Sequence, residues 1–332
     1  MDFTFTDDQI AFRDAVRDLL SDCCAPAAVR AAWEAQAPWD DTRWSALADM
    51  GVLGAAAPES DGGLGLGLTD VVLLAEESGR AALPEPMVDT VVVAPDLLAA
   101  AGGEAAVWSG RIAAGDAKVV TALCGNEWIA GAADADLVLE REGDALVGFT
   151  AATWEVEPSV DRSRRLARRV AGEPDFRIGG LDPALDAAFD RGATATAAQL
   201  VGVARHLIET TVAYAQERHQ FGQPIGGFQA VKHHLADALL AVEFAAPVVY
   251  RAAWMLDRGD ATASRDASMA KAMAGDAAEQ AARVALQVHG AIGFTFEYDL
   301  HLWMKRAWAL AADWRDADWH RERVARVVLD GA

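Results

Sequence analysis

Two segments in the C-terminal half of the chain combine residue types that can bind an anion or move a proton. The first is ERHQFGQPIGGFQAVKHHLAD, in which one helix is expected to end near Glu217 and the next to begin around Phe228 and Gln229. The loop between these helices contains Arg218 and Gln220. Guanidinium and amide groups beside a helix N-terminus can bind phosphate by charge, hydrogen bonds and unpaired backbone N–H groups. The segment therefore predicts an anion site or, alternatively, a rigid turn between two helices.

The second segment is ALQVHGAIGFTFEYDLHLWMKR, which places Glu297 among Phe294, Phe296 and Tyr298. A carboxylate surrounded by apolar rings loses hydration, and its pKa rises toward the range of a general base at neutral pH. A glutamate at such a position is more usually a solvated residue in the first turn of a helix. Both interpretations remain open from the residues alone.

Two further segments could either bind a ligand or have a purely structural role. The stretch GVLGAAAPESDGGLGLGLTD, residues 51–70, is rich in glycine but lacks a G-x-x-x-x-G-K-[ST] motif and a preceding strand. It favours a structural turn over a nucleotide loop. The stretch DRSRRLARR, residues 161–169, is the one basic island of the chain. It predicts a solvated segment or a contact with an anion or an acidic partner.

The pattern along the chain predicts helices at both ends and strands in the middle. Thr6 and Gln9 have the spacing of a capping box. Short β-branched segments separated by turn residues extend from 118 to about 190. Helices are expected over 5–35, 42–50, 71–80, 193–218, 228–258, 262–289 and 297–328.

This order predicts an α+β fold in three parts. The first is an N-terminal helical domain and the second is a small β domain. The third is a C-terminal bundle of four long, alanine-rich helices. The expected boundaries are 1–115, 116–190 and 191–332.

Composition excludes several classes of function. The 332 residues include 29 Lys and Arg against 50 Asp and Glu, a formal charge of -21, which would repel nucleic acid or an anionic membrane. Cys23, Cys24 and Cys124 form neither a disulfide framework nor a Cys-x-x-Cys metal pair. The first residues carry no basic and apolar leader, and no uninterrupted apolar run of about 18 residues follows. We expect a soluble, cytoplasmic protein without a metal.

Four segments together are similar to the acyl-CoA dehydrogenase family. They are FTDDQIAFRDAVRDLL, ALADMGVLGAAAPESDGGLGLGLTDVVLLAEESGR, ERHQFGQPIGGFQAVKHHLAD and QVHGAIGFTFEYDLHLWMKR, in this order. The resemblance implies an N-terminal helical domain, a β middle domain and a C-terminal four-helix bundle. It also implies FAD bound near a subunit interface and oxidation of an acyl-CoA thioester to the 2,3-enoyl-CoA. A separate electron acceptor would then reoxidise the flavin.

The resemblance also suggests roles for individual residues. Glu297 is similar to the base that removes the α proton, and the stretch 190–205, where some relatives place this base, contains no glutamate. Arg218, Gln220 and Phe221 resemble residues that hold the pyrophosphate and adenine side of FAD on a neighbouring subunit. Four other positions resemble supporting residues of that site: Gln229, Gln287, Gly290 and Gly293.

The middle of the chain departs from the family pattern. The family contacts the flavin ring with a T-E-P-x-A-G-S-D loop and a W-I-T-N strand, of which only Thr121 and the pair Trp128 and Ile129 remain. Such a shortened chain resembles subunits of actinobacterial heteromeric acyl-CoA dehydrogenases, which act on bulky thioesters such as sterol side chains. We therefore expect a heterotetramer with a longer chain, or a homo-oligomer. The alternative to catalysis is a structural subunit that completes the FAD site of its partner.

Overall fold

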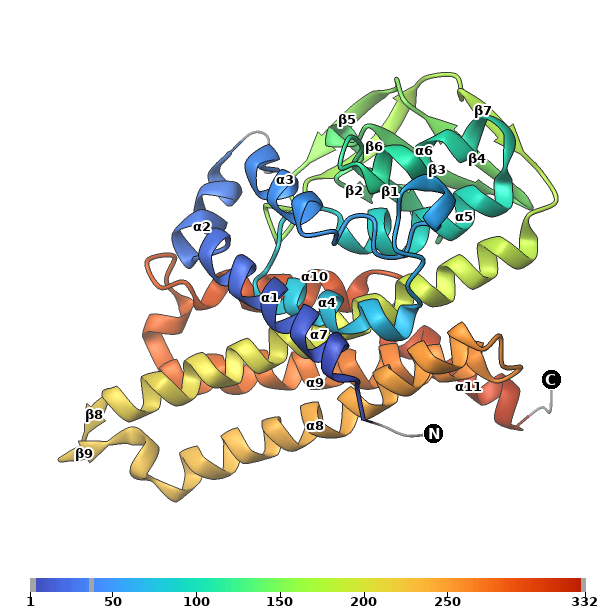
Figure 1. Cartoon of the computed structure of the whole chain (residues 1–332). Coiled ribbons are helices and arrows are strands. Elements are labelled where there is room, and N and C mark those ends of the chain that lie inside the picture. Colours follow the sequence, from blue (N-terminus) through green and yellow to red (C-terminus); the bar gives the residue numbers. More distant parts are fainter. Residues whose placement is uncertain (1–3, 36–38, 330–332) are drawn as a thin grey trace.

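The computed structural model describes residues 4–35 and 39–329 and has the three parts that the sequence predicts (Figure 1). A helical N-terminal domain and a small β domain lie on one side of a set of long C-terminal helices. The N-terminal helices are α1 (Asp7–Cys23), α2 (Pro26–Glu34), α3 (Asp41–Asp49), α4 (Leu68–Arg80), α5 (Ala94–Ala101) and α6 (Gly103–Ala113), with a π-helical turn η2 (Val88–Val93) before α5.

The first helix begins as predicted but ends earlier. The amide of Gln9 donates to Thr6 Oγ1 at 3.2 Å, and the amide of Thr6 donates to Gln9 Oε1 at 2.8 Å, so the capping box is confirmed. The single helix expected over 5–35 is wrong, because Pro26 starts a separate helix, α2. A proline has no N–H to donate and is tolerated at the first helical turn, not in a helix interior.

Two small sheets make up the middle domain. One has the strand order β1-β3-β4-β7, and the other has the order β2-β6-β5. Only β1 and β3 run parallel; the other pairs are antiparallel. The strands are β1 (Val119–Ala122), β2 (Ile129–Ala130), β3 (Leu137–Glu142), β4 (Ala145–Phe149), β5 (Thr153–Glu157), β6 (Leu166–Ala171) and β7 (Phe176–Ile178).

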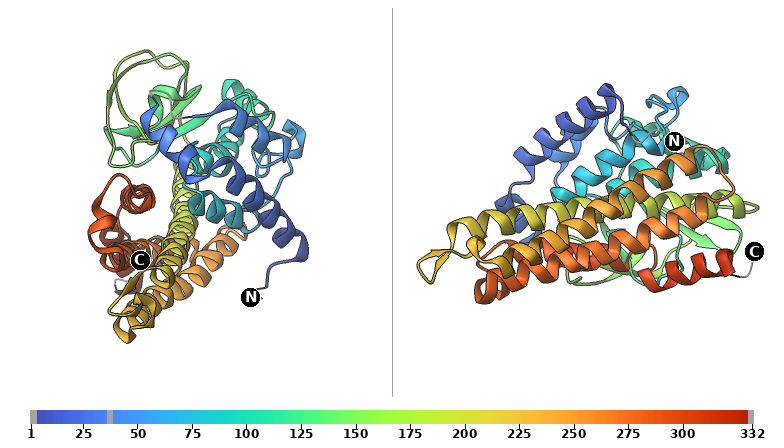
Figure 2. Two further views of the ribbon diagram at one scale, coloured as in Figure 1. Left: turned by 90° about the vertical axis from the view of Figure 1, so that its left-hand side faces the viewer. Right: turned by 90° about the horizontal axis from the view of Figure 1, so that it is seen from below.

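The C-terminal region contains three long helices and two shorter ones that pack on them (Figure 2). They are α7 (Asp182–Glu217), α8 (Gln229–Asp257), α9 (Ala263–His289), α10 (Leu300–Ala312) and α11 (Ala317–Leu329). The bounds of α8 and α9 agree with the prediction. The strand pattern expected to about residue 190 ends at Ile178, since Asp182 and Pro183 already start α7.

The helix expected over 297–328 is interrupted between α10 and α11. Trp314 and Arg315, between the two helices, have positive φ angles of 53° and 71°. This left-handed conformation is costly for residues other than glycine, so the break is a specific feature of the fold.

Arg306 on α10 ties the three parts of the molecule together. Its guanidinium forms an ion pair with Asp161, and both side chains are almost fully buried. It also donates to Ser163 Oγ at 2.8 Å and to the carbonyl of Leu83 at 2.7 Å. Because Leu83 belongs to the N-terminal domain and Asp161 and Ser163 to the β domain, one side chain fixes the mutual position of all three parts.

Helix α8 is the one described helix that is long and apolar enough to cross a membrane by length and composition. Its most apolar window has a mean hydropathy of 1.4, and 39% of that window is buried inside the chain. Helices in the interior or at the interfaces of soluble proteins can have the same composition.

Candidate functional site

The Arg218 segment forms a β-hairpin at the end of α7. Strands β8 (His219–Gln220) and β9 (Gln223–Pro224) pair in antiparallel fashion. The two loop residues, Phe221 and Gly222, both have positive φ, 53° and 84°, as a type I′ turn requires. This turn places the Phe221 ring at the tip of the hairpin, where 93% of the residue is exposed.

Arg218 leaves its charged group free for a ligand. Its amide donates to the carbonyl of Tyr214 at 2.8 Å, and its carbonyl accepts from Ile225, so its backbone is fixed. Among the described residues, none pairs with its guanidinium. The following helix α8 begins at Gln229, and its N-cap residue Phe228 supplies no capping side chain. The open amides of this first turn and the free guanidinium fit a phosphate group.

The other predicted residues lie at the same end of the bundle. The Tyr214 ring, one turn before Arg218, stacks on His289 with centroids 4.2 Å apart, and His289 contacts Tyr298 at 5.1 Å. The two predicted segments therefore meet, through Tyr214 just before the first and His289 and Tyr298 in the second. Gln287 is exposed on the last turns of α9. Gly290, which ends this helix, has φ +64°, and a side chain at Gly293 would press on Leu286 at 3.1 Å.

Of the two interpretations of Glu297, the described chain has the solvated one. Glu297 is exposed, and so are its neighbours Phe294 (75%) and Phe296 (58%). The apolar rings thus do not enclose the carboxylate within this chain. Glu297 precedes α10, whose 13 residues correspond to a length of about 20 Å. The role of Glu297 as a base remains a prediction.

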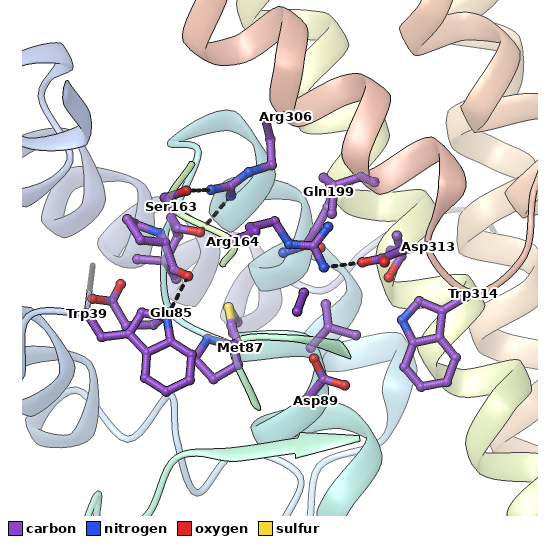
Figure 3. Close-up of a pocket in the computed structure, with 18 residues that line it drawn as sticks. Trp39, Glu85, Met87, Asp89, Ser163, Arg164, Gln199, Arg306, Asp313 and Trp314 are labelled. Carbon is purple, nitrogen blue, oxygen red and sulfur yellow. Dashed lines mark hydrogen bonds and ion pairs between the residues drawn. The ribbon is translucent and has the colours of Figure 1, made fainter. Parts of the chain in front are cut away.

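At the other end of α10 lie two small cavities, one of which is shown in Figure 3. Of the residues singled out in the sequence, Thr121, Trp128 and Ile129 line the second cavity. The volumes of the two cavities are about 40 and 50 Å³. Both are lined by Asp89, Arg164, Asp313 and Trp314, so they adjoin. The side chains of Arg164 and Asp313 form an ion pair between them. The residues come from η2, the β domain and the break after α10, which are far apart in sequence.

The electrostatics of these cavities are unusual. Burial, with a smaller contribution from the nearby Asp313 carboxylate, raises the pKa of Asp89 to about 6 against the opposing effects of the hydrogen bonds from Thr121 and the charge of Arg164. Burial likewise lowers the pKa of Lys271 to about 8. Perturbed titratable groups mark candidate ligand sites, although structural ion pairs produce them as well.

The two ambiguous segments have structural roles. Four arginines of the basic island pair with carboxylates of the chain itself: Arg164 with Asp313, Arg165 with Asp134, Arg168 with Glu127 and Glu155, and Arg169 with Glu140 and Glu142. In the glycine-rich stretch, the Asp257 carboxylate accepts hydrogen bonds from the amides of Leu68 and Thr69, both at 2.7 Å. The α4 N-terminus is thus already capped, which supports the turn over the nucleotide loop.

Comparisons with known proteins agree with this fold. The family described as acyl-CoA dehydrogenase, N-terminal domain, matches residues 6–116, and the C-terminal domain matches residues 179–328. Acyl-CoA dehydrogenase IpdE2 of Mycolicibacterium smegmatis is 34% identical over 89% of this chain and 90% of the relative. Acyl-CoA dehydrogenase FadE34 of Mycobacterium tuberculosis is 35% identical over 92% of this chain and 45% of the relative.

Solved structures of heteromeric complexes are similar as well. A chain of the Tcur3481-Tcur3483 steroid ACAD, G363A variant, has a TM-score of 0.90 at 25% identity, with 98% of each chain covered. A chain of the ChsE4-ChsE5 complex from Mycobacterium tuberculosis has a TM-score of 0.87 at 25% identity, with 99% of each chain covered. The fold, the matches to both family domains and the similarity to a relative of nearly equal length all agree. The chain therefore belongs to the acyl-CoA dehydrogenase family of FAD-dependent oxidoreductases.

Proposed function

We propose that this chain is a subunit of a heteromeric acyl-CoA dehydrogenase and holds the phosphate half of the FAD of a neighbouring chain. The observation that carries this proposal is the position of the β8–β9 hairpin, which projects from the bundle away from the β domain (Figure 1). Gln199 of α7 lines an interdomain cavity, and Arg218 follows it by 19 residues, which is about 28 Å along a helix. The hairpin thus faces outward, toward a second chain.

Exposed apolar side chains on the hairpin and on α8 favour such a neighbour. Phe221 at the tip of the hairpin is almost fully exposed, and on α8 the side chains of Leu240 (54%) and Phe244 (69%) are exposed one turn apart. Aromatic and aliphatic side chains gathered on one surface are typical of a protein interface, because burying them in an assembly removes apolar area from water.

The chemistry of the hairpin suits a pyrophosphate. The Arg218 guanidinium can donate two parallel hydrogen bonds to phosphate oxygens, and the α8 amides add donors without a charge of their own. Gln220 and Gln229 are exposed amides beside this group. Bound FAD would supply the hydride acceptor of the family reaction, while these residues bind and orient its phosphates.

The relatives support a more specific proposal for the partner and the substrate. The similarity to steroid ACAD and ChsE4-ChsE5 chains supports a longer acyl-CoA dehydrogenase chain as the partner and a heterotetramer as the assembly. It also supports a bulky acyl-CoA, such as a sterol-derived thioester, as the substrate. A separate acceptor would take the electrons.

The test is FAD affinity in the co-expressed assembly. Arg218→Ala should weaken FAD binding about ten-fold or more, because a charged hydrogen bond contributes roughly 1.5–3 kcal/mol. Arg326→Ala is the matched control, since Arg326 is exposed on α11 and, within the described part of the chain, pairs with Glu322. Equal FAD affinity in the two variants would contradict the proposed role of the hairpin.

A further inference from the structure

The β-domain residues that are expected from the sequence to contact a flavin ring pack against other side chains of the chain itself. Thr121, Trp128 and Ile129, the remaining matches to the family's ring-contacting segments, line one cavity of about 50 Å³. Arg164, Asp313 and Trp314 line the same cavity. Ligand pockets usually measure about 300–1,000 Å³, and the room here suits one or a few water molecules. The residues present therefore do not fit an isoalloxazine ring.

The turn of residues 313–316, whose Asp313 and Trp314 line this cavity, is held in place from three directions. Lys271 of α9 donates to the carbonyls of Ala311 at 2.9 Å and Arg315 at 3.0 Å. His320 of α11 donates to the carbonyl of Trp314 at 2.8 Å. Arg315 in turn donates to the carbonyl of Cys124, beside the ring-contacting segment, at 2.5 Å. A turn with two positive φ angles persists only where surrounding contacts over-determine it.

Side-chain contacts of Trp314 and Asp313 also hold the 313–316 turn in its position. The Trp314 indole, 7% exposed, packs on Gly192 of α7 and contacts Phe189 with centroids 5.9 Å apart. The Asp313 carboxylate is paired with Arg164, and the two side chains are 30% and 17% exposed. Moving the turn would break this ion pair and expose the indole together.

We propose that the 313–316 turn permanently occupies the flavin-ring position of this chain, so that the chain binds no flavin ring and every ring of the assembly belongs to the partner. This inference deepens the proposed function, because a chain that holds only the phosphate half of a neighbour's FAD needs no ring pocket of its own.

Photolabelling of the co-expressed assembly with FAD that carries an azide on its benzenoid ring tests the inference. The label should attach to the partner only, and absorbance should give one FAD for each pair of unlike chains. A labelled peptide from residues 118–131 or 311–316 of this chain, or two FAD per pair, would overturn the inference.

The same experiment separates the two proposals. In the Arg218→Ala variant, an unchanged FAD affinity would contradict the proposed role of the hairpin. If the label in that variant still attaches to the partner only, the proposal that the 313–316 turn occupies the ring position remains supported. Labelling of this chain would contradict that proposal, whatever the effect of Arg218→Ala on affinity.

Discussion

Trp314 packs directly against Gly192: a Cβ atom at position 192 would lie 2.5 Å from Cη2 of the indole. This contact joins the break between α10 and α11 to the first third of α7 and positions Trp314, which lines both interdomain cavities. Only a glycine on α7 allows the indole to approach so closely.

Gly192→Ala should therefore destabilise the protein. The added methyl group must displace the Trp314 ring, and overpacking of this kind costs about 1–3 kcal/mol. Gly275→Ala on α9 is the matched control, since a Cβ there meets nothing within 4 Å, and it should be neutral or stabilising by up to about 1 kcal/mol. Urea unfolding of both variants measures the difference, and equal midpoints would contradict the contact.

Breaking the buried ion pair of Arg306 and Asp161 should cost more free energy of unfolding than breaking the exposed pair of Arg321 and Asp276. Arg306→Met leaves the Asp161 charge buried without its ion-pair partner, which costs about 3–5 kcal/mol. Arg321→Met removes a comparable pair with Asp276, but both of those side chains are about half exposed, so the cost is about 0–1 kcal/mol. Thermal unfolding followed by circular dichroism tests this order, and a similar loss in both variants would refute it.

Asp89 should make the stability of the protein depend on pH. Its pKa is about 6 in the fold and 3.8 in an unperturbed chain, so the folded state binds more protons between these values. The stability from this group is present below pH 4 and is lost as pH rises through 6. Asp89→Asn keeps an acceptor for Thr121 and should gain on the order of 2 kcal/mol relative to wild type from pH 4 to 7.

Comparing Asp89→Asn with wild type at each pH cancels the titration of all other carboxylates. Urea midpoints at pH 4, 5, 6 and 7 give the difference directly. A difference that stays constant over this range would show that Asp89 titrates normally.

Glu297→Gln tests the base predicted from the sequence. If the partner holds the flavin ring, as we propose, the exposed Glu297 of this chain is not the base, and turnover in the co-expressed assembly should be unchanged. Glu104→Gln on α6, also exposed, is the control. Turnover lost in Glu297→Gln alone, with the flavin spectrum retained, would instead establish the catalytic role.

The apolar face of α8 should be needed for assembly. Phe244→Asp places a charge on a side chain that is 69% exposed and should reduce the native mass of the complex, because the interface would have to bury that charge. Val107→Asp on α6 changes a side chain of similar exposure, 64%, and should leave the mass unchanged. Size-exclusion chromatography with light scattering compares them.

The sequence by itself determined the local features of this protein. The capping box at Thr6, the bounds of α8 and α9 and the β-branched strands depend on neighbouring residues, and the chain signals them directly. The break at Pro26 and the start of α7 at Asp182 and Pro183 had a signal too, since proline marks a helix start.

Only the tertiary structure decided the sites. The break after α10 depends on residues of three separate helices, so no local pattern could reveal it: Lys271 binds the carbonyls of Ala311 and Arg315, His320 binds that of Trp314, and Gly192 admits the indole. The exposure of Glu297 likewise depends on how far its neighbours pack over it, which aromatic composition alone does not fix. Long-range packing thus separates residues that a motif groups together and joins residues that the sequence keeps apart.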